Sequence, residues 1–171
     1  MTDPAGAREA FLRRFGMVAE HSPWVAEEAW ASAPLGTTDD VVEAFARAIN
    51  RAQPQRLLSL IQAHPDLAGR AAVAGELGPE SAREQASVGL DRLTPNDFAR
   101  FTALNDAYRR RFNFPFIICV REHTVDSILD QFEVRLGHDR TREIETARDE
   151  ITKIVALRIR DQSPPDDLSR S

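Results

Sequence analysis

Polar residues interrupt apolar helix patterns at three places in this chain, and their side chains could together bind an anion and move protons. The first is His64, which shares a helical face with Leu57, Leu60 and Ile61 and directly precedes Pro65. Because proline disfavours the helical conformation in the residue before it, we expect the imidazole at a helix end, against an apolar wall. An imidazole titrates near neutral pH and can act as an acid or a base. The alternative is a core histidine whose hydrogen bonds are satisfied within the protein.

The second interruption is Arg158, which follows Ile144, Ala147, Ile151 and Ile154 along one face of a long helix pattern. A guanidinium on a buried stripe needs an anionic partner or several acceptors, so it could clamp an anionic ligand. A carboxylate inside the protein would explain the same pattern without a ligand. So would a side chain that reaches solvent at the helix end.

The third interruption is the stretch 81–89, where Ser81 and Glu84 point the same way from one helix. A Glu84 carboxylate that met His64 would orient the ring and raise its basicity. The competing interpretation is a capping box, in which Ser81 and Glu84 close the start of a helix just after Pro79. The same helix is expected to offer a face of small residues that another element can approach closely: Ala82, Ala86 and Gly89.

The spacing of possible ligands does not favour metal or phosphate chemistry. The four histidines form no His-x-x-x-His pair, and Cys119 is the single cysteine. The sequence has no zinc-ligand spacing, no glycine-rich phosphate loop and no Gly-x-Ser-x-Gly nucleophile motif. We therefore expect an enzyme built on this sequence to work with side chains alone, with no metal and no cofactor.

The composition is that of a soluble globular protein, with 42% hydrophobic and 29% charged residues. The net charge of -5 argues against a general affinity for nucleic acid or anionic membranes. Without a signal peptide or an apolar run of bilayer length, a cytoplasmic location is expected. The length of 171 residues suits one domain, expected over residues 1–162. The first few residues and a C-terminal tail over 163–171 are expected to be disordered.

Most of the chain has helical periodicity, which predicts an all-α single-domain bundle of about seven or eight helices. Hydroxyl side chains or prolines mark several helix starts: Ser22-Pro23, Thr37-Thr38, Pro54, Pro79, Thr94-Pro95 and Thr124. One helix is expected to end at Gly137 in a left-handed conformation, and the longest to run from Arg140 to about Asp161. The helix after Thr94 is predicted to face inward through Phe98, Phe101, Leu104 and Tyr108.

Residues 112–120 are the exception, being apolar, aromatic and broken by Pro115. Proline excludes a regular helix and a central strand here, so the pattern predicts a buried extended segment over 114–120. The backbone groups of such a segment must find partners in side chains, water or a ligand. A connector that crosses the core and binds nothing is equally compatible with the pattern.

Five stretches of the chain, in order and at plausible separations, resemble one family: SPWVAEEAW, HPDLAGR, SAREQASVGL, FTALNDAYRRRFNFPFIICVR and KIVALRIRD. That family is the 2-oxo-4-hydroxy-4-carboxy-5-ureidoimidazoline (OHCU) decarboxylases of uric acid degradation. The resemblance runs from about Phe11 to Asp161. It implies an all-helical fold, a homodimer, no cofactor, and decarboxylation of the ureidoimidazoline to (S)-allantoin.

The resemblance also implies a set of functional residues. The catalytic residues would be His64, Glu84 and Arg158, which are the positions that break the apolar patterns. The substrate pocket would be lined by further residues and by the backbone around Ile118: Pro65, Ser81, Gln85, Phe116 and Ile118. The family commonly has glycine where this chain has Asn113, and asparagine tolerates left-handed conformations better than most residues.

Two other function classes remain as alternatives. A helical binding module could hold ureide intermediates or a partner enzyme without chemistry, although all three implied catalytic positions are intact. A metal-dependent hydrolase of a related ureide is the weaker alternative.

Overall fold

The computed structural model describes residues 4–69, 72 and 75–163, which form helices joined by turns and irregular segments, with no strand among them. The expected all-α fold is confirmed. By its contacts the chain divides into two compact units, one of Met1–Ala63 with Ile151–Ser171 and the other of His64–Glu150. The expected disorder at the first residues and over 164–171 falls outside the described residues, whereas Ser163 is described and buried.

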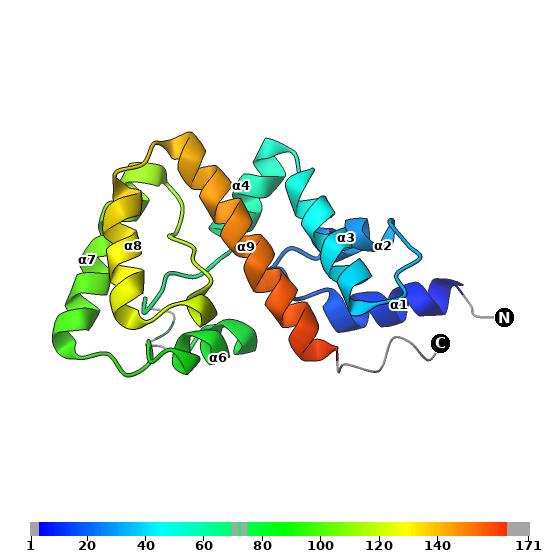
Figure 1. Ribbon diagram of the computed structural model, residues 1–171, viewed down its shortest axis with the longest axis horizontal. Coiled ribbons are helices and arrows are strands. Elements are labelled where there is room, and N and C mark those ends of the chain that lie inside the picture. The colour runs from blue at the N-terminus through cyan, green and yellow to red at the C-terminus, as the bar shows by residue number, and fades with distance from the viewer. Residues whose placement is uncertain (1–3, 70–71, 73–74, 164–171) are drawn as a thin grey trace. The chain divides into compact units, whose positions relative to one another are not determined.

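The first unit is built around an aromatic cluster. Its helices are α1 (Pro4–Phe15), α2 (Trp24–Trp30), α3 (Thr38–Asn50), α4 (Pro54–Gln62) and the C-terminal part of α9 (Arg140–Gln162). Contacts join α2 to α3 and to α1 (Figure 1). The rings of Phe11, Phe15, Trp30 and Phe45 meet with centroids 5.1–6.4 Å apart. Each fully buried phenylalanine contributes about 1.5–3 kcal/mol, so this cluster is a main source of the unit's stability.

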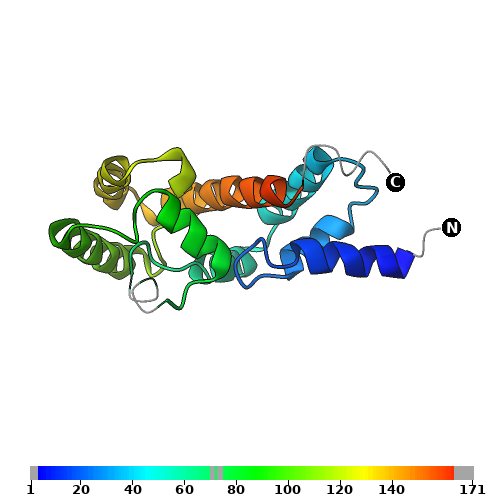
Figure 2. The ribbon, with the colours of Figure 1, turned by 90° about the horizontal axis from the view of Figure 1, so that it is seen from below.

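The second unit pairs two helices over another aromatic core. It contains α6 (Pro79–Ser87), α7 (Pro95–Phe112), the 3-10 helix η1 (Val120–Glu122), α8 (Val125–Leu136) and the first part of α9. Helices α7 and α8 lie side by side (Figure 1), and Figure 2 shows the same pair from below. Their core is a group of aromatic rings in mutual contact: Phe101, Tyr108, Phe112, Phe114, Phe116 and Phe132.

Local signals set most helix starts as expected. Thr37 and Thr124 close capping boxes at α3 and α8, and the Thr94 hydroxyl accepts the backbone N–H of Asp97 at α7. The prediction for Ser22 is wrong, because its side chain makes no cap and is buried. The prediction for Gly137 is also wrong, because its φ is −80°. Helix α8 ends in tight turns in which the Val134 and Arg135 carbonyls accept the Gly137 and His138 N–H groups, and such turns need no left-handed residue.

The buried faces of two helices differ from the predicted ones. On α7, Phe98 is 39% exposed, and the inward positions are Phe101, Asn105, Tyr108 and Phe112. On α6, the buried residues are Ser81 and Gln85, whereas Ala82 of the expected small-residue face is exposed. The physical reason is the same in both helices. A polar side chain, Asn105 on α7 and Gln85 on α6, takes an inward position because it hydrogen-bonds to the backbone of residues 66–68.

The extended segment is present as predicted. Asn113 ends α7 in the left-handed conformation, with φ 61° and ψ 31°. Residues 114–119 have no regular secondary structure, all of them are buried, and Val120 already belongs to η1. The predicted range of 114–120 is therefore one residue longer than the irregular segment.

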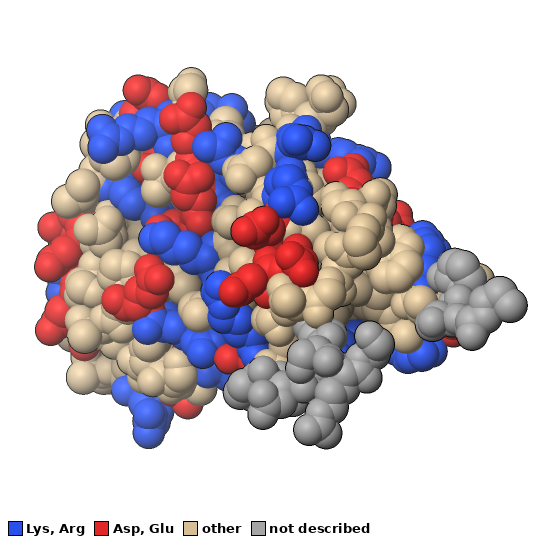
Figure 3. Space-filling model, turned by 45° about the vertical axis from the view of Figure 1, so that its right-hand side comes forward, with Lys and Arg blue, Asp and Glu red and all other residues tan. Residues whose placement is uncertain are grey.

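Charges of both signs are interspersed on the face that Figure 3 shows, with no large region of a single sign. This face does not offer the broad basic patch that a phosphate backbone requires. Among the described helices, none combines the length and the apolar character needed to cross a bilayer.

Candidate active site

His64 lies immediately beyond the end of α4. The helix buries Leu57, Leu60 and Ile61, its C-cap is Ala63, and His64 is 6% exposed. Pro65 follows and is half-buried. The prediction of an imidazole at a helix end is confirmed, and the break occurs where proline prevents the helix from continuing.

The turn that follows His64 is held by hydrogen bonds from two helices. On α6, Gln85 accepts the Ala68 N–H with Oε1 at 3.0 Å and places Nε2 3.4 Å from the Asp66 carbonyl. On α7, Asn105 Nδ2 donates to the Leu67 carbonyl at 2.8 Å. Ala68 has a φ of 48°, which is unfavourable for a residue with a Cβ, so these bonds hold the turn in a conformation it would otherwise leave.

A salt bridge fixes the outer side of the same turn. Arg109 Nε lies 2.9 and 3.1 Å from the two carboxylate oxygens of Asp66. The pair is partly exposed, so it contributes at most about 1 kcal/mol. Its main effect is orientation, since Arg109 lies one helical turn beyond Asn105 and both side chains reach the same three-residue turn.

Helix α6 presents Ser81, Glu84 and Gln85 on adjacent positions. Ser81 is 5% exposed and Glu84 is half-buried. The capping-box interpretation is wrong, because α6 begins at Pro79, its N-cap is Gly78 and no side chain caps it. Ser81 is therefore a buried polar residue inside the first turn of α6.

A cavity of about 480 Å³ lies beside α6 and the start of α7. Its lining is mostly apolar and includes Ala68, Ala82, Leu90 and Phe98. Gln85 is the one predicted site residue among the described residues that line it. The predicted residues as a group therefore do not gather around this cavity.

The extended segment is fastened by side chains from α8 and α9. Arg135 Nη1 donates to the Ile117 carbonyl at 2.7 Å, and the Cys119 N–H donates to Glu150 Oε2 at 2.7 Å. The Phe116 ring stacks on Phe132 with centroids 3.7 Å apart. Phe116 and Ile118, both predicted pocket residues, are buried at 1% and 4% exposure.

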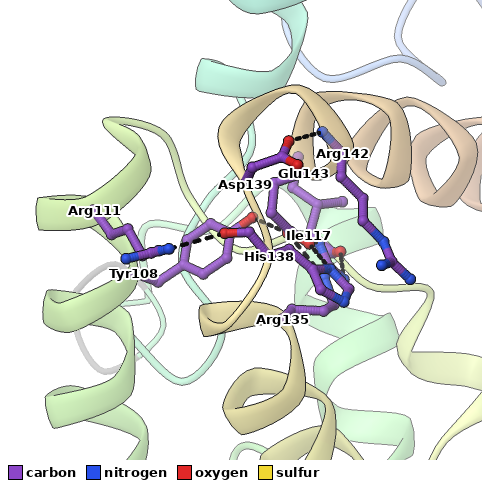
Figure 4. Close-up of polar contacts among 8 residues, drawn as sticks. All are labelled: Tyr108, Arg111, Ile117, Arg135, His138, Asp139, Arg142 and Glu143. Carbon is purple, nitrogen blue, oxygen red and sulfur yellow. Dashed lines mark hydrogen bonds and ion pairs between the residues drawn. The ribbon is translucent and has the colours of Figure 1, made fainter.

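Glu143 is the centre of a buried polar network behind this segment (Figure 4). It is completely buried and accepts hydrogen bonds from Tyr108 Oη and from Arg135 Nε, the latter at 3.0 Å. The His138 ring places Nδ1 2.8 Å from Glu143 Oε1. Burial, together with donation to Glu143, raises the pKa of Tyr108 far above its ordinary value, so the phenol stays protonated and remains a donor.

Arg158 lies on α9 and belongs to the first unit, whereas His64 and Glu84 belong to the second. Its guanidinium is 4% exposed, donates from Nη1 to the Val18 carbonyl and pairs through Nη2 with Glu20 Oε1, both at 3.1 Å. The carboxylate partner considered as an alternative is thus present. Glu20 offsets the buried charge and fixes the direction of the planar guanidinium.

Several polar residues of this region were missed by the sequence analysis: Asp66, Asn105, Arg109, Arg135, Glu143 and Glu150. Asn105 could have been found, because it lies between Phe101 and Tyr108 on an apolar face, as His64 and Arg158 do on theirs. The others had no such signal. Among the described residues, no group of three or more His, Cys, Asp or Glu side chains is arranged to hold a metal ion.

The protein is of an all-helical class in which two irregular stretches are fixed by side chains of neighbouring helices. One is the turn at 66–68 that follows His64, called here the histidine turn, and the other is the segment 114–119. The sequence model of the OHCU decarboxylase family matches residues 4–160, and the chain belongs to this family.

Named relatives support this assignment. A protein of Halalkalicoccus jeotgali is 41% identical over 160 residues, which cover 94% of this chain and 89% of the relative. A protein of Haloferax volcanii is 40% identical, with 88% of each chain covered. Both are named 2-oxo-4-hydroxy-4-carboxy-5-ureidoimidazoline decarboxylase.

Solved structures share the fold. A crystal structure of (S)-allantoin synthase matches with a TM-score of 0.68 and 29% identity, and the match covers 94% of this chain but 51% of that one. An OHCU decarboxylase crystallised in the presence of (S)-allantoin matches with a TM-score of 0.67 over 84% of this chain and 93% of that one. At 23% identity, the second match supports the fold alone.

Proposed function

We propose that this protein decarboxylates 2-oxo-4-hydroxy-4-carboxy-5-ureidoimidazoline to (S)-allantoin in uric acid degradation, as a carboxy-lyase. The observation that carries the proposal is the 41% identity to a decarboxylase of that name across 94% of this chain and 89% of the relative. Similarity of this extent along nearly the whole of both chains supports a shared reaction as well as a shared fold.

The substrate can supply its own electron sink. One ring carbon bears a hydroxyl and a carboxylate, and the neighbouring carbon forms a C=N bond and bears the ureido group. When the bond to the carboxylate breaks, its electron pair forms a C=C bond between the two ring carbons, and the C=N pair moves to nitrogen, which takes up a proton. The resulting enol loses its hydroxyl proton, and the carbon bearing the ureido group gains a proton on one face. We propose that no metal or organic cofactor takes part.

His64, Glu84 and Arg158 are the proposed catalytic residues. His64 moves protons between the hydroxyl and the reacting ring atoms, and Glu84 orients the imidazole or hydrogen-bonds the ureido nitrogens. Arg158 donates a planar fork to carbonyl, ureido or carboxylate oxygens of the substrate. The bonds from Arg158 to Glu20 and to the Val18 carbonyl support this role, because a guanidinium held at a fixed angle loses less entropy on binding.

Pro65, Ser81, Gln85, Phe116 and Ile118 are the proposed substrate-binding residues. Burial of Ser81 and Gln85 on one helix supports this assignment, because neither position contributes apolar packing. Ile118 would contribute its backbone, which lies between two peptide groups that bond to side chains of α8 and α9, at the Ile117 carbonyl and the Cys119 N–H. A chiral pocket of this kind delivers a proton to one face of the ring.

The optical rotation or circular dichroism of the product tests the proposal. Freshly generated substrate decays spontaneously to racemic allantoin, so an active enzyme yields product of one hand. Racemic product at the uncatalysed rate would contradict the proposal and favour the non-catalytic binding module. Loss of activity on treatment with a chelator would instead favour a metal-dependent hydrolase.

We further propose a homodimer located in the cytoplasm. The resemblance to the family supports the dimer, and light scattering coupled to size-exclusion chromatography measures it directly. A mass equal to one 19.1 kDa chain at working concentrations would contradict it.

A further inference from the structure

The two peptide groups that flank Ile118 are held by side chains from different helices. Arg135 of α8 donates to the Ile117 carbonyl, and Glu150 of α9 accepts the Cys119 N–H, each at 2.7 Å. Both interactions are charge-assisted, which makes them shorter and stronger than bonds between neutral groups. The backbone on each side of Ile118 is therefore fixed from outside the segment.

Peptide planarity transmits this constraint to Ile118 itself. In a trans peptide the C=O of one residue and the N–H of the next point in opposite directions. The Ile118 N–H therefore points away from Arg135, and the Ile118 C=O points away from Glu150. Within the described part of the chain, neither group has a hydrogen-bond partner, although Ile118 is only 4% exposed. More than nine in ten buried backbone groups are paired, so this adjacent donor and acceptor, like other unpaired groups of the segment, must find a partner in water or in a ligand.

The Arg135 side chain is rigid because it is enclosed on several sides. Its Nε and Nη2 both lie 3.0 Å from Glu143 Oε2, and its guanidinium carbon lies 4.2 Å from the centroid of the Phe116 ring (Figure 4). Tyr108 and His138 fix Glu143 in turn. With Arg135 only 2% exposed, the guanidinium has little freedom to leave the Ile117 carbonyl.

We propose that Arg135 and Glu150 are positioning residues that present the Ile118 N–H and C=O to the ring of a cyclic ureide. Such a ring has an N–H donor beside a C=O acceptor, which complements the two backbone groups. This inference rests on the proposed function for the identity of the ligand, but neither residue takes part in proton transfer or touches the reacting atoms.

Calorimetric titration with (S)-allantoin tests the inference without turnover. Arg135→Lys keeps a positive charge for Glu143 but lacks the fork that reaches Glu143 and Ile117 together. Glu150→Ala removes the acceptor of the Cys119 N–H. Each variant is expected to raise the Kd by about tenfold, the effect of one well-made hydrogen bond. Each is also expected to lower the enantiomeric excess of the product, which a loss of stability alone would not do.

Tyr108→Phe is the matched control. It removes one donor to Glu143 but keeps the aromatic ring, the Arg135–Glu143 pair and both bonds to the flanking peptide groups, so it should lower the melting temperature and raise the Kd by much less than tenfold. Wild-type affinity in folded Arg135→Lys and Glu150→Ala would overturn the inference, as would failure of the wild type to bind (S)-allantoin. If Arg135→Lys does not fold, Glu150→Ala decides alone. Racemic product from a wild type that binds allantoin would refute the proposed function. The Kd values of Arg135→Lys and Glu150→Ala would still decide this inference.

Discussion

Asn105 offers a direct test of how the histidine turn is held. Its Nδ2 donates to the Leu67 carbonyl at 2.8 Å, the residue is 5% exposed, and its Oδ1 has no hydrogen-bond partner among the described residues. Replacing it by alanine leaves a buried carbonyl without its donor, which typically costs about 1–3 kcal/mol. Removing the unpaired Oδ1 offsets part of that loss. We therefore expect Asn105→Ala to lower the free energy of unfolding by about 1–2 kcal/mol.

Aspartate is the more informative substitution at this position. Asn105→Asp preserves the shape of the side chain but replaces the donor with a second acceptor facing the Leu67 carbonyl. A buried carboxylate without a partner is costly, so the loss should be about 3 kcal/mol or more at pH 7. Size alone predicts the opposite order, because aspartate resembles asparagine far more closely than alanine does.

Urea denaturation and thermal melting followed by circular dichroism measure both variants. For a chain of this length each kcal/mol shifts the melting temperature by about 2–4 °C, so the alanine variant should melt about 2–8 °C lower. Thr102→Ala, on an exposed turn of α7, is the control and should change stability by less than about 0.5 kcal/mol. An Asn105→Asp variant as stable as Asn105→Ala, or more stable, would refute the assignment of Asn105 as a donor to the turn.

Three further outcomes follow from the structure. His64→Ala should remain folded and lose about a hundredfold to ten-thousandfold in kcat, and wild-type turnover would exclude His64 as the proton-transfer group. Asn113→Gly should change the free energy of unfolding by less than about 0.5 kcal/mol, whereas Asn113→Val should cost about 1–2 kcal/mol in urea titrations, because valine resists a φ of 61°. Hydrogen bonds from Thr37 lower the pKa of Asp40, so its contribution to stability is complete above the ordinary carboxyl pKa and disappears as the pH falls through the lowered one. Urea titrations from pH 6 downward should therefore show a smaller loss of stability for Asp40→Asn than for wild type, and equal losses would contradict this.

Helix starts could be predicted because their causes are local. The hydroxyls of Thr37, Thr94 and Thr124 bond to backbone within three residues, and no distant contact is needed to make the cap. The prediction for Ser22 failed because its side chain is buried and makes no cap. Gly137 failed because α8 ends in turns that do not require a left-handed residue.

The buried polar residues of the candidate site show the same difference between local and distant causes. His64, Ser81, Gln85 and Arg158 were predicted, and all four are buried. Glu143 was missed because an acidic side chain on a charged helix normally faces solvent, and periodicity favoured Ile144 as the inward position. Its burial depends on donors from two other helices, and no pattern within α9 contains them.

The role proposed for Ile118 has a consequence for altering the enzyme's specificity. A recognition group that belongs to the main chain is supplied by every amino acid except proline, so exchanging Ile118 for another apolar residue would leave its N–H and C=O in place. A library that randomises only the side chains around the ligand would then never reach this determinant. A different ring would be accepted by turning the peptide planes, and Arg135 and Glu150 are the positions from which an engineer could turn them.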